Sequence, residues 1–443
     1  MEAVVYEGDC LKVMDDFEND VFDAIITDPP AGISFMGKKW DHHMGGRDQW
    51  ITWMATVAAE CLRVTKPGGH ALVWSLPRTG HWTATAWENA GWEIRDVIGH
   101  LFGSGFPKST DVSKQLDKTA GVEREVVGKR EHPTLIDKSK VNRQSATQYH
   151  ATNSIKDEWN ITAPATDAAK QWDGYGTALK PAHEDWILMR KPLCGTVAQN
   201  VLKHGVGGIN IDGCRVEINP DVDDPRLGGK GDWSSDKMAK NVYEGGYAGV
   251  RVGSSTLGRF PANIIHDGSN DVLELFPNTK SEVPGIKHTG NSGAAYGKES
   301  RPPGTQMGGY GDVGSASRFF YCAKASKSER GVDNKHPTVK PIALMRYLCR
   351  LITPRGGLIL DPFAGSGSTG VAATAEGFDS VLIELEAVSA NVARSRNIQK
   401  TINGGGEKET PSSSCNCEMS AVSRIINREP DMSGVAYDTE FTG

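Results

Sequence analysis

Residues 357–370 read Gly-Leu-Ile-Leu-Asp-Pro-Phe-Ala-Gly-Ser-Gly-Ser-Thr-Gly, and this stretch decides the fold. The apolar run at 357–360 predicts a strand that ends at Asp361, and residues 368–376 predict a helix of small residues. Gly365 and Gly367 let the backbone turn sharply and approach a ligand closely. This order of strand, glycine loop and helix is typical of a nucleotide-binding turn. No Lys follows the glycines, which excludes a P-loop.

An acidic residue, Glu384, follows the next predicted strand (380–383), and this position suits a carboxylate that binds both ribose hydroxyls of an adenosine. The alternative is a tight structural turn, which a lone pair of glycines would favour. Strand, glycines, helix and distal acid occur together here, and this combination favours the nucleotide site.

Strands and helices also alternate in the first part of the chain. The pattern predicts strands at 3–7, 22–27, 70–75 and 93–102, helices at 10–17, 50–62 and 83–89, and a Pro-Gly-Gly turn at 67–69. Such alternation indicates an α/β fold, with a parallel sheet and helices on both of its faces.

Changes in composition divide the chain into six segments. We expect one half of the α/β domain at 1–105, a polar and partly flexible insertion at 106–180, a return to the sheet at 181–204, an irregular glycine-rich region at 205–330, the nucleotide-binding half at 331–402 and a disordered tail at 403–443.

Residues 28–31 read Asp-Pro-Pro-Ala and follow the predicted strand 22–27. An Asp at the carboxyl end of a parallel strand faces the ligand crevice of the sheet. Pro29 and Pro30 stiffen the loop and leave its carbonyls as free acceptors. The Asp28 carboxylate and the Pro29 carbonyl can then both accept hydrogens from an exocyclic amine, which exposes the nitrogen lone pair. Alone, this segment would indicate only an Asp-Pro turn.

Together, Asp28-Pro-Pro and Asp361-Pro-Phe-Ala-Gly-Ser-Gly resemble the motifs of DNA amino-methyltransferases that use S-adenosylmethionine (AdoMet) and methylate adenine N6 or cytosine N4. The order of the two motifs is similar to that of the circularly permuted β group, and residues 32–41 are similar to phage and prophage enzymes. The resemblance covers roughly 1–105 and 180–400 in broken pieces. It implies a Rossmann-like methyltransferase sheet with a target-recognition region at 205–330.

The resemblance also implies a cofactor site. Gly8-Asp9-Cys10 matches the segment whose Asp contacts the cofactor adenine, residues 336–341 match the segment beside the methionine end, and residues 183–191 match a later strand. The implied cofactor-binding residues are Asp9, Cys10, His336, Thr338, Lys340, Asp361, Phe363, Gly365, Ser366, Gly367 and Glu384. The implied catalytic residues are Asp28, Pro29, Pro30 and Ala31.

Ala31 departs from the family, whose loop normally has Tyr or Phe at this position. That aromatic ring stacks on the flipped target base, and such stacking contributes ~1–3 kcal/mol per base. Three interpretations stay open: an inactivating change, a natural variant in which another aromatic such as Phe35 or Trp40 stacks on the base, and a pocket enlarged for a different base or group. The coherent motif at 32–41 favours the natural variant.

The implied reaction is direct in-line attack of the amine on the sulfonium methyl, without a covalent cysteine intermediate. Adenine N6 is favoured over cytosine N4, because Asp-Pro-Pro leans to adenine in the family and Ser-Pro-Pro to cytosine. The rivals are a DNA-binding decoy that keeps its affinity for AdoMet, a methyltransferase for RNA or protein amides, and a nicotinamide oxidoreductase, in which Asp28-Pro-Pro has no role.

Composition limits the remaining classes. The chain has 443 residues, a net charge of −6 and eight Cys without a CxxC pair, so we expect reduced thiols, a cytoplasmic location and no metal site. No apolar run of ~18 residues predicts a membrane span. By analogy with the family, we also expect a homodimer.

The overall charge hides a basic stretch, since residues 301–355 carry 10 Lys and Arg against 3 Asp and Glu. Basic side chains mixed with aromatic ones are typical of nucleic-acid contacts. We therefore expect double-stranded DNA as the partner. A solvated surface over a buried Phe-Phe-Tyr strand at 319–321 is an equal alternative. The expected DNA-binding residues are Lys38, Lys39, Arg318, Lys324 and Lys327.

Overall fold

The computed structural model describes residues 1–33, 41, 44–103, 105, 109–131, 158–217, 258–280, 313–324 and 339–403. Its tertiary contacts form two compact units, Met1–Gly103 with His183–Gly443, and Ser104–Ala182. Several predicted residues lie outside the described ranges, namely Phe35, Lys38, Lys39, Trp40, Lys327, His336, Thr338 and the tail beyond 403.

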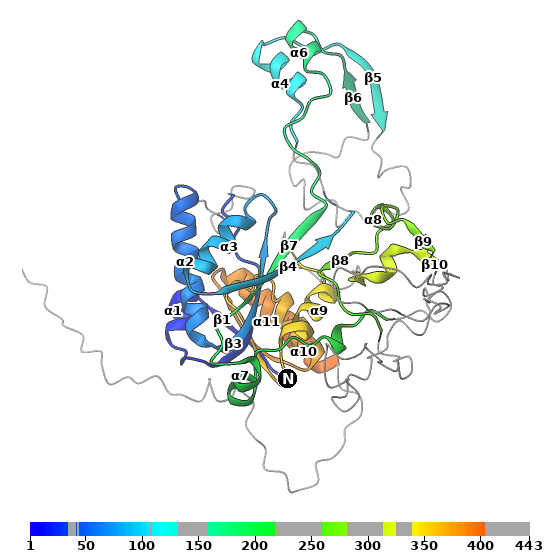
Figure 1. The fold of residues 1–443 in the computed structure, drawn as a ribbon. Coiled ribbons are helices and arrows are strands. Elements are labelled where there is room, and N and C mark those ends of the chain that lie inside the picture. The colour runs from blue at the N-terminus through cyan, green and yellow to red at the C-terminus, as the bar shows by residue number, and fades with distance from the viewer. Residues whose placement is uncertain are drawn as a thin grey trace, which may run out of the picture. The chain divides into compact units, whose positions relative to one another are not determined.

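Nine strands of the described chain form one sheet in the first unit (Figure 1). Across the sheet the order is β1 (Ala3–Glu7), β13 (Asp379–Glu384), β12 (Leu358–Asp361), β2 (Phe22–Thr27), β3 (Thr65–Ser75), β7 (His183–Arg190), β4 (Glu93–Leu101), β8 (Ile264–His266) and β11 (Tyr321–Cys322). β7 runs antiparallel to both of its neighbours, and the other pairs are parallel. The predicted α/β fold is confirmed, whereas the prediction of an all-parallel sheet is wrong. An apolar strand pattern does not encode the direction of the strand.

Helices cover both faces of this sheet (Figure 1). α1 (Cys10–Asp15), α2 (Arg47–Val64) and α3 (Gly80–Asn89) pack on one face, and α9 (Ile342–Ile352) and α10 (Ser368–Glu376) pack on the other. In β2, Phe22 and Ile25 join the first core, while Ala24 and Ile26 join the second. α11 (Ala387–Asn403) packs beside α10 and β1. Burial of both faces explains why β2 is apolar at nearly every position.

Two local differences from the sequence prediction have simple causes. Residues 67–69, predicted as a turn, lie inside β3, because the strand bulges there between Thr65, which pairs with Phe22, and His70, which pairs with Ala24. β8 and β11 extend the sheet, although they belong to the region expected to be irregular. Strands of three and two residues are too short for a periodic signal.

The remaining described elements of the first unit are short. They are α7 (Val197–His204), η4 (Asp212–Cys214), α8 (Asn270–Leu273), β9 (Asn278–Lys280), β10 (Val313–Ser315) and η6 (Ala316–Phe319).

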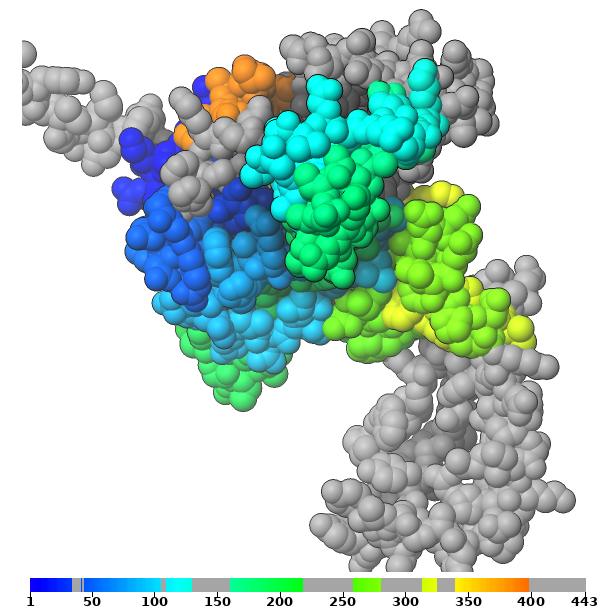
Figure 2. All heavy atoms as spheres, turned by 90° about the horizontal axis from the view of Figure 1, so that it is seen from above, coloured from blue at the N-terminus to red at the C-terminus, as the bar shows by residue number. Residues whose placement is uncertain are grey.

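The second unit is folded around a buried carboxylate. It contains α4 (Val112–Thr119), β5 (Val126–Glu131), β6 (Glu158–Thr162) and α6 (Asp167–Gln171), and its cyan and green spheres lie together in Figure 2. Asp117 is 1% exposed and accepts hydrogen bonds from Arg124 Nη1 at 2.9 Å and from the Thr166 hydroxyl at 2.8 Å. A polar sequence can therefore still order locally, because its buried charge is paired.

Candidate active site

Four acidic side chains from distant parts of the sequence follow neighbouring strands at one edge of the sheet. Asp28 follows β2, Asp361 ends β12, Glu384 ends β13 and Asp9 follows β1. β12 lies between β2 and β13, and Glu7 of β1 is in register with Glu384. The carboxyl ends of parallel strands form the ligand crevice in this class of sheet. The structure therefore brings the predicted motifs together.

Asp361 links three elements of this edge. Its Oδ1 accepts hydrogen bonds from Thr27 Oγ1 at 2.7 Å and from the Phe363 N–H at 3.1 Å, and its Oδ2 accepts one from Thr369 Oγ1. The carboxyl group is 2% exposed. Burial raises the pKa of Asp361 to about 7, although the two hydroxyl groups oppose this shift. Through these hydrogen bonds, Asp361 connects the end of β2 to the glycine loop and to α10.

Glu384 organises the glycine loop from the opposite side. Its Oε2 accepts the Gly365 N–H at 2.8 Å, and its Oε1 accepts the Glu386 N–H at 2.8 Å. Burial raises the pKa of this carboxyl group. Each oxygen keeps capacity for another hydrogen bond, so the carboxylate can still accept from a pair of ligand hydroxyls. Gly365 has a φ of +53°, a conformation that favours glycine.

The second half of the glycine loop contacts α11. Arg396 Nη1 donates to the Ser366 carbonyl at 2.7 Å and to the Ser366 hydroxyl at 2.9 Å. A Cβ atom at Gly367 would lie 2.8 Å from the Cβ of Ala393. The Ser366 side chain therefore serves packing, and Gly367 permits close approach of the helix. The sequence motif gave no signal for Arg396, because α11 lies outside the motif.

The start of α1 adjoins Glu384. The Gly8 N–H donates to the Glu384 carbonyl at 3.0 Å, and Asp9 Oδ1 caps the helix by accepting the N–H groups of Leu11 at 3.0 Å and Lys12 at 3.3 Å. Cys10 is 8% exposed and packs in the core. Burial raises the pKa of its thiol to about 12. Asp9 thus lies at the predicted edge, whereas the Cys10 side chain points away into the core.

Phe363 provides an aromatic wall beside the loop. Its ring is partly buried against the first core, and its centroid lies 6.0 Å from that of Trp53 on α2.

Asp28 lies against a buried ammonium group. Lys340 Nζ is 3.2 Å from Asp28 Oδ2, 3.3 Å from Glu184 Oε2 and 3.9 Å from the centroid of the Trp74 ring. The Lys340 side chain is 10% exposed. The structure therefore places Lys340, predicted as a cofactor-binding residue, against Asp28, predicted as a catalytic residue.

Glu184 completes this group. Its Oε2 accepts a hydrogen bond from Trp74 Nε1 at 2.6 Å, and its Oε1 lies 3.1 Å from His100 Nδ1. Burial alone would raise the pKa of Glu184, but Lys340, His100 and Trp74 lower it to about 2. Burial raises the pKa of Asp28 to about 6, with Lys340 opposing and Glu184 adding to the shift. Sequence reasoning missed Trp74, His100 and the role of Glu184, whose segment was matched only as a strand.

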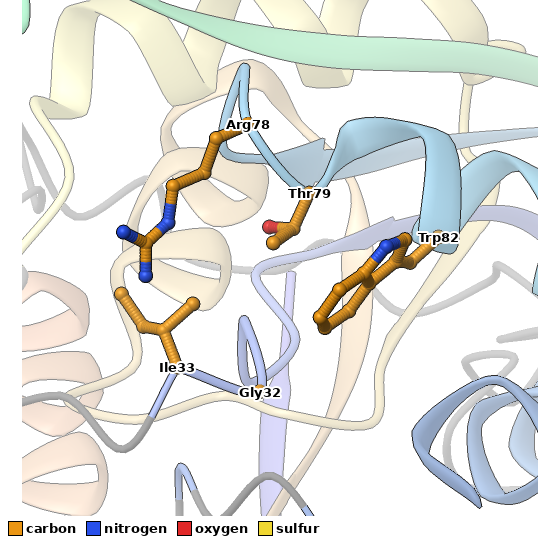
Figure 3. Close-up of a pocket in the computed structure, with 5 residues that line it drawn as sticks. All are labelled: Gly32, Ile33, Arg78, Thr79 and Trp82. Carbon is orange, nitrogen blue, oxygen red and sulfur yellow. The ribbon is translucent and has the colours of Figure 1, made fainter. Parts of the chain in front are cut away.

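A pocket of about 370 Å³ begins directly after Ala31 and is lined by Gly32, Ile33, Arg78, Thr79 and Trp82 (Figure 3). Arg78 and Trp82 extend toward the Gly32–Ile33 backbone from the residues that begin α3. The Gly32 N–H donates to Asp41 Oδ1 at 2.8 Å, which holds the loop in place. The pocket thus adjoins the position where the family has an aromatic side chain.

Two of the predicted DNA-binding residues, Arg318 and Lys324, lie in the described chain, and their surroundings differ. Arg318 Nη1 donates to the carbonyls of Gly314 at 2.6 Å and Ser315 at 2.7 Å, so its guanidinium contacts its own loop. Tyr321 stacks on Tyr347 at 4.2 Å between centroids. Lys324 is exposed. The aromatic residues at 319–321 are thus at least partly core residues.

Among the described residues, no group of His, Cys, Asp and Glu could hold a metal ion. In the same ranges, no helix is long and apolar enough to cross a bilayer.

Residues 22–395 match the family model N6_N4_Mtase, which is described as DNA methylase. The chain belongs to this family. The predicted resemblance is therefore confirmed at the family level, and the Asp-Pro-Pro loop, the glycine loop and Glu384 all lie within the matched range.

Curated relatives in this family match over short stretches. The putative methylase YubD of Escherichia coli K12 is 48% identical over 96 residues, which cover 21% of this chain and 40% of the relative. The type II methyltransferase M2.DpnII of Streptococcus pneumoniae is 44% identical over 83 residues, or 19% of this chain and 31% of the relative. The matched stretches thus span well under half the length of these relatives.

Solved structures of DNA methylases align over more of the chain at low identity. The PvuII cytosine-N4-specific DNA methyltransferase is 12% identical, with 89% of this chain and 86% of that chain covered and a TM-score of 0.41. The M1.HpyAVI–SAM complex is 14% identical, with 89% and 100% covered and a TM-score of 0.34.

Proposed function

We propose that this DNA methylase family member transfers a methyl group from AdoMet to an exocyclic amine of DNA, with adenine N6 favoured over cytosine N4. The observation that carries the proposal is the position of the Asp28 carboxylate, one strand away from the Asp361–Gly367 loop at the same sheet edge. The order of these motifs along the chain supports the permuted β group, and the motif at 32–41 supports a phage-type enzyme.

The residues present fit AdoMet. Glu384 has hydrogen-bonding capacity left for the ribose hydroxyls, since in the described chain Oε2 accepts from Gly365 and Oε1 from Glu386, and each oxygen has two lone pairs. Asp9 adjoins Glu384 and suits the adenine amine, while Phe363 and Trp53 suit an apolar contact. When bound, AdoMet supplies an electrophilic methyl group on a sulfonium.

Asp28 orients the target amine. Above a pH of about 6 its carboxylate is ionised and accepts one amine hydrogen, and the Pro29 carbonyl accepts the other. These two acceptors would leave the nitrogen lone pair available for the methyl group that bound AdoMet would supply, with loss of one amine proton and release of the cofactor as a thioether. Proximity and orientation then supply most of the rate enhancement.

The pocket beside Ala31 supports the natural-variant interpretation. An amine inside a duplex cannot be reached, so the target base must leave the stack. The pocket offers the Trp82 indole and the Arg78 guanidinium next to the loop, and both groups can stack on a base. Trp82 can thus replace the missing aromatic at position 31.

Replacement of Asp28 tests the reaction. In Asp28→Asn we expect methyl transfer to DNA to fall about a hundredfold or more, because the amide oxygen faces the Lys340 ammonium and an NH2 donor then faces the amine. AdoMet binding measured by calorimetry should stay within a few-fold. Asp48→Asn, whose side chain is 82% exposed on α2, is the matched control and should be unaffected. Full activity of Asp28→Asn would refute the proposed role.

Ala31→Tyr separates the proposal from its rival, a DNA-binding decoy that binds AdoMet and lost catalysis through Ala31. If Trp82 already stacks on the target base, a second ring at position 31 should leave the rate of methyl transfer unchanged or lower it. An assay with radiolabelled AdoMet measures this rate. Activity that appears only in Ala31→Tyr would favour the decoy. A drop on restoration would exclude the inactivating-change interpretation.

A further inference from the structure

Two carboxylates share one ammonium group beside the predicted amine site. We use the name Asp28 cluster for Asp28, Lys340, Glu184, Trp74 and His100. These residues come from five separate parts of the first unit: the loop after β2, the residues before α9, β7, β3 and β4. Because the cluster is built from so many elements, its geometry is fixed by the sheet.

We propose that Glu184 and Lys340 are positioning residues for Asp28: Glu184 holds the Lys340 ammonium, and the ammonium binds Asp28 Oδ2, so that Asp28 Oδ1 is presented to the target amine. This inference rests on the proposed function and deepens it. It also assigns Lys340 to the reacting side of the crevice, where it acts through Asp28.

The contacts of Lys340 support this assignment. Its ammonium has three donor hydrogens, and it meets the Asp28 carboxylate at 3.2 Å, the Glu184 carboxylate at 3.3 Å and the face of the Trp74 ring at 3.9 Å. A cation over an indole face is favourable, and more so when water is excluded. These three contacts surround the ammonium with the residues of the Asp28 cluster.

The two carboxylates differ in their other partners. Glu184 also accepts from Trp74 Nε1 at 2.6 Å and pairs with His100 at 3.1 Å. Among the described residues, the Asp28 carboxylate pairs only with Lys340, through Oδ2, and its side chain is 22% exposed. No donor in the described chain contacts Asp28 Oδ1. Glu184 is therefore the fixed anchor, and Asp28 is the member with an acceptor oxygen available to a ligand.

The charges around Asp28 oppose one another. The ammonium of Lys340 favours ionised Asp28, whereas the carboxylates of Glu184, Asp41 and Asp361 disfavour it. His100 faces Glu184 from β4. Removal of Lys340 should thus make Asp28 harder to ionise, and removal of the Glu184 charge should make it easier. A purely structural role for both residues would not predict opposite effects.

The test is the pH dependence of methyl transfer at saturating AdoMet and DNA, in full-length wild type, Lys340→Met and Glu184→Gln. We expect the acid limb of the rate profile to move up by about one pH unit in Lys340→Met and down in Glu184→Gln. Glu376→Gln is the matched control, because Glu376 is also largely buried in ion pairs, with Arg346 and Arg350, and lies outside the cluster. The acid limb of the rate profile of Glu376→Gln should coincide with that of wild type.

An activity-independent readout separates this inference from the proposed function. The difference in unfolding free energy between each protein and its Asp28→Asn derivative changes with pH until Asp28 is ionised in the folded state. The pH at which this difference stops changing should rise in Lys340→Met and fall in Glu184→Gln. This readout works even if wild type fails to methylate DNA, which would refute the proposed function alone.

Shifts in the same direction, or no shift in either variant, would overturn the inference and leave the proposed function standing. If Lys340→Met does not fold, the downward shift in Glu184→Gln still decides the matter, because its amide keeps an acceptor for Lys340 and for Trp74.

Discussion

Two carboxylates at the same sheet edge, the buried Asp361 and the partly exposed Asp28, differ in their partners. Asp361 accepts three hydrogen bonds, from Thr27, Phe363 and Thr369, and these connect β2, the glycine loop and α10. In the described ranges, Asp28 has one cationic partner, Lys340, which contacts Oδ2 and not Oδ1. Environment rather than residue type thus separates the structural acid from the acid that orients a substrate.

Cys10→Ser tests the absence of a cysteine nucleophile. Burial raises the pKa of the Cys10 thiol to about 12, so almost no thiolate exists at neutral pH and the thiol cannot drive catalysis. We expect the rate of methyl transfer to stay within about threefold of wild type, with a lowered melting temperature because a buried polar group is introduced. Cys194→Ser is the control, because Cys194 is exposed, and its rate and melting temperature should both stay near those of wild type. Complete loss of transfer with AdoMet binding retained would contradict this account.

Among the elements, the glycine loop and α11 pack closely against each other, and Gly367 lies at their contact. Gly367 has a φ of +76°, and a Cβ there would meet α11 at 2.8 Å. Gly377 after α10 has a φ of +85° with nothing within 4 Å of a built Cβ. The two positions thus share a left-handed backbone, which a residue with a Cβ adopts with strain, and they differ in the space available to that Cβ.

This pair yields a stability prediction. Gly377→Ala should cost about 1–2 kcal/mol of unfolding free energy from the left-handed backbone alone, and Gly367→Ala should cost about 1–3 kcal/mol more through overpacking. Urea titration of both variants measures the difference. Equal costs would show that α11 yields to the extra methyl group and does not constrain the loop.

The sequence predicted individual helices and strands, but it did not predict which side chains pair across the fold. The helix Ser368–Glu376 and the strand Phe22–Thr27 agree with the predicted ranges, because each has a clear apolar pattern and a breaker at its end.

The Asp28 cluster shows why the site was only partly predicted. Glu184 lies 156 residues from Lys340 in sequence, and no local pattern specifies that pairing. The acids at strand ends were predictable because sheet topology alone places them at one edge. The pairing of Glu184 with Lys340 depends on the position and direction of β7, which the apolar pattern did not encode.

At the scale of the whole molecule, the second unit is an insertion in a hairpin. Leu101 at the end of β4 pairs with His183 at the start of β7, so the chain leaves and re-enters the sheet at neighbouring positions. The 104–182 unit has its own contacts. The first unit should therefore not need it to fold.

Replacement of residues 104–182 by a short glycine-containing turn tests this independence. We expect a cooperative thermal transition within a few degrees of wild type and unchanged AdoMet binding, because the β4–β7 ladder stays intact. A deletion that also removes β7 is the control and should not fold, since it takes away the strand between β3 and β4. An insoluble product from the first deletion would show that the unit supports the sheet.

The central claim is methyl transfer to a base amine of DNA by the Ala31 form. Its most direct test is long-read sequencing of unmethylated DNA treated with the pure protein and AdoMet, with Asp28→Asn as the control. The account predicts N6-methyladenine at a defined sequence with wild type and none with Asp28→Asn. Unmodified DNA from a wild-type protein that binds both AdoMet and DNA, or methylation on a base carbon, would contradict it.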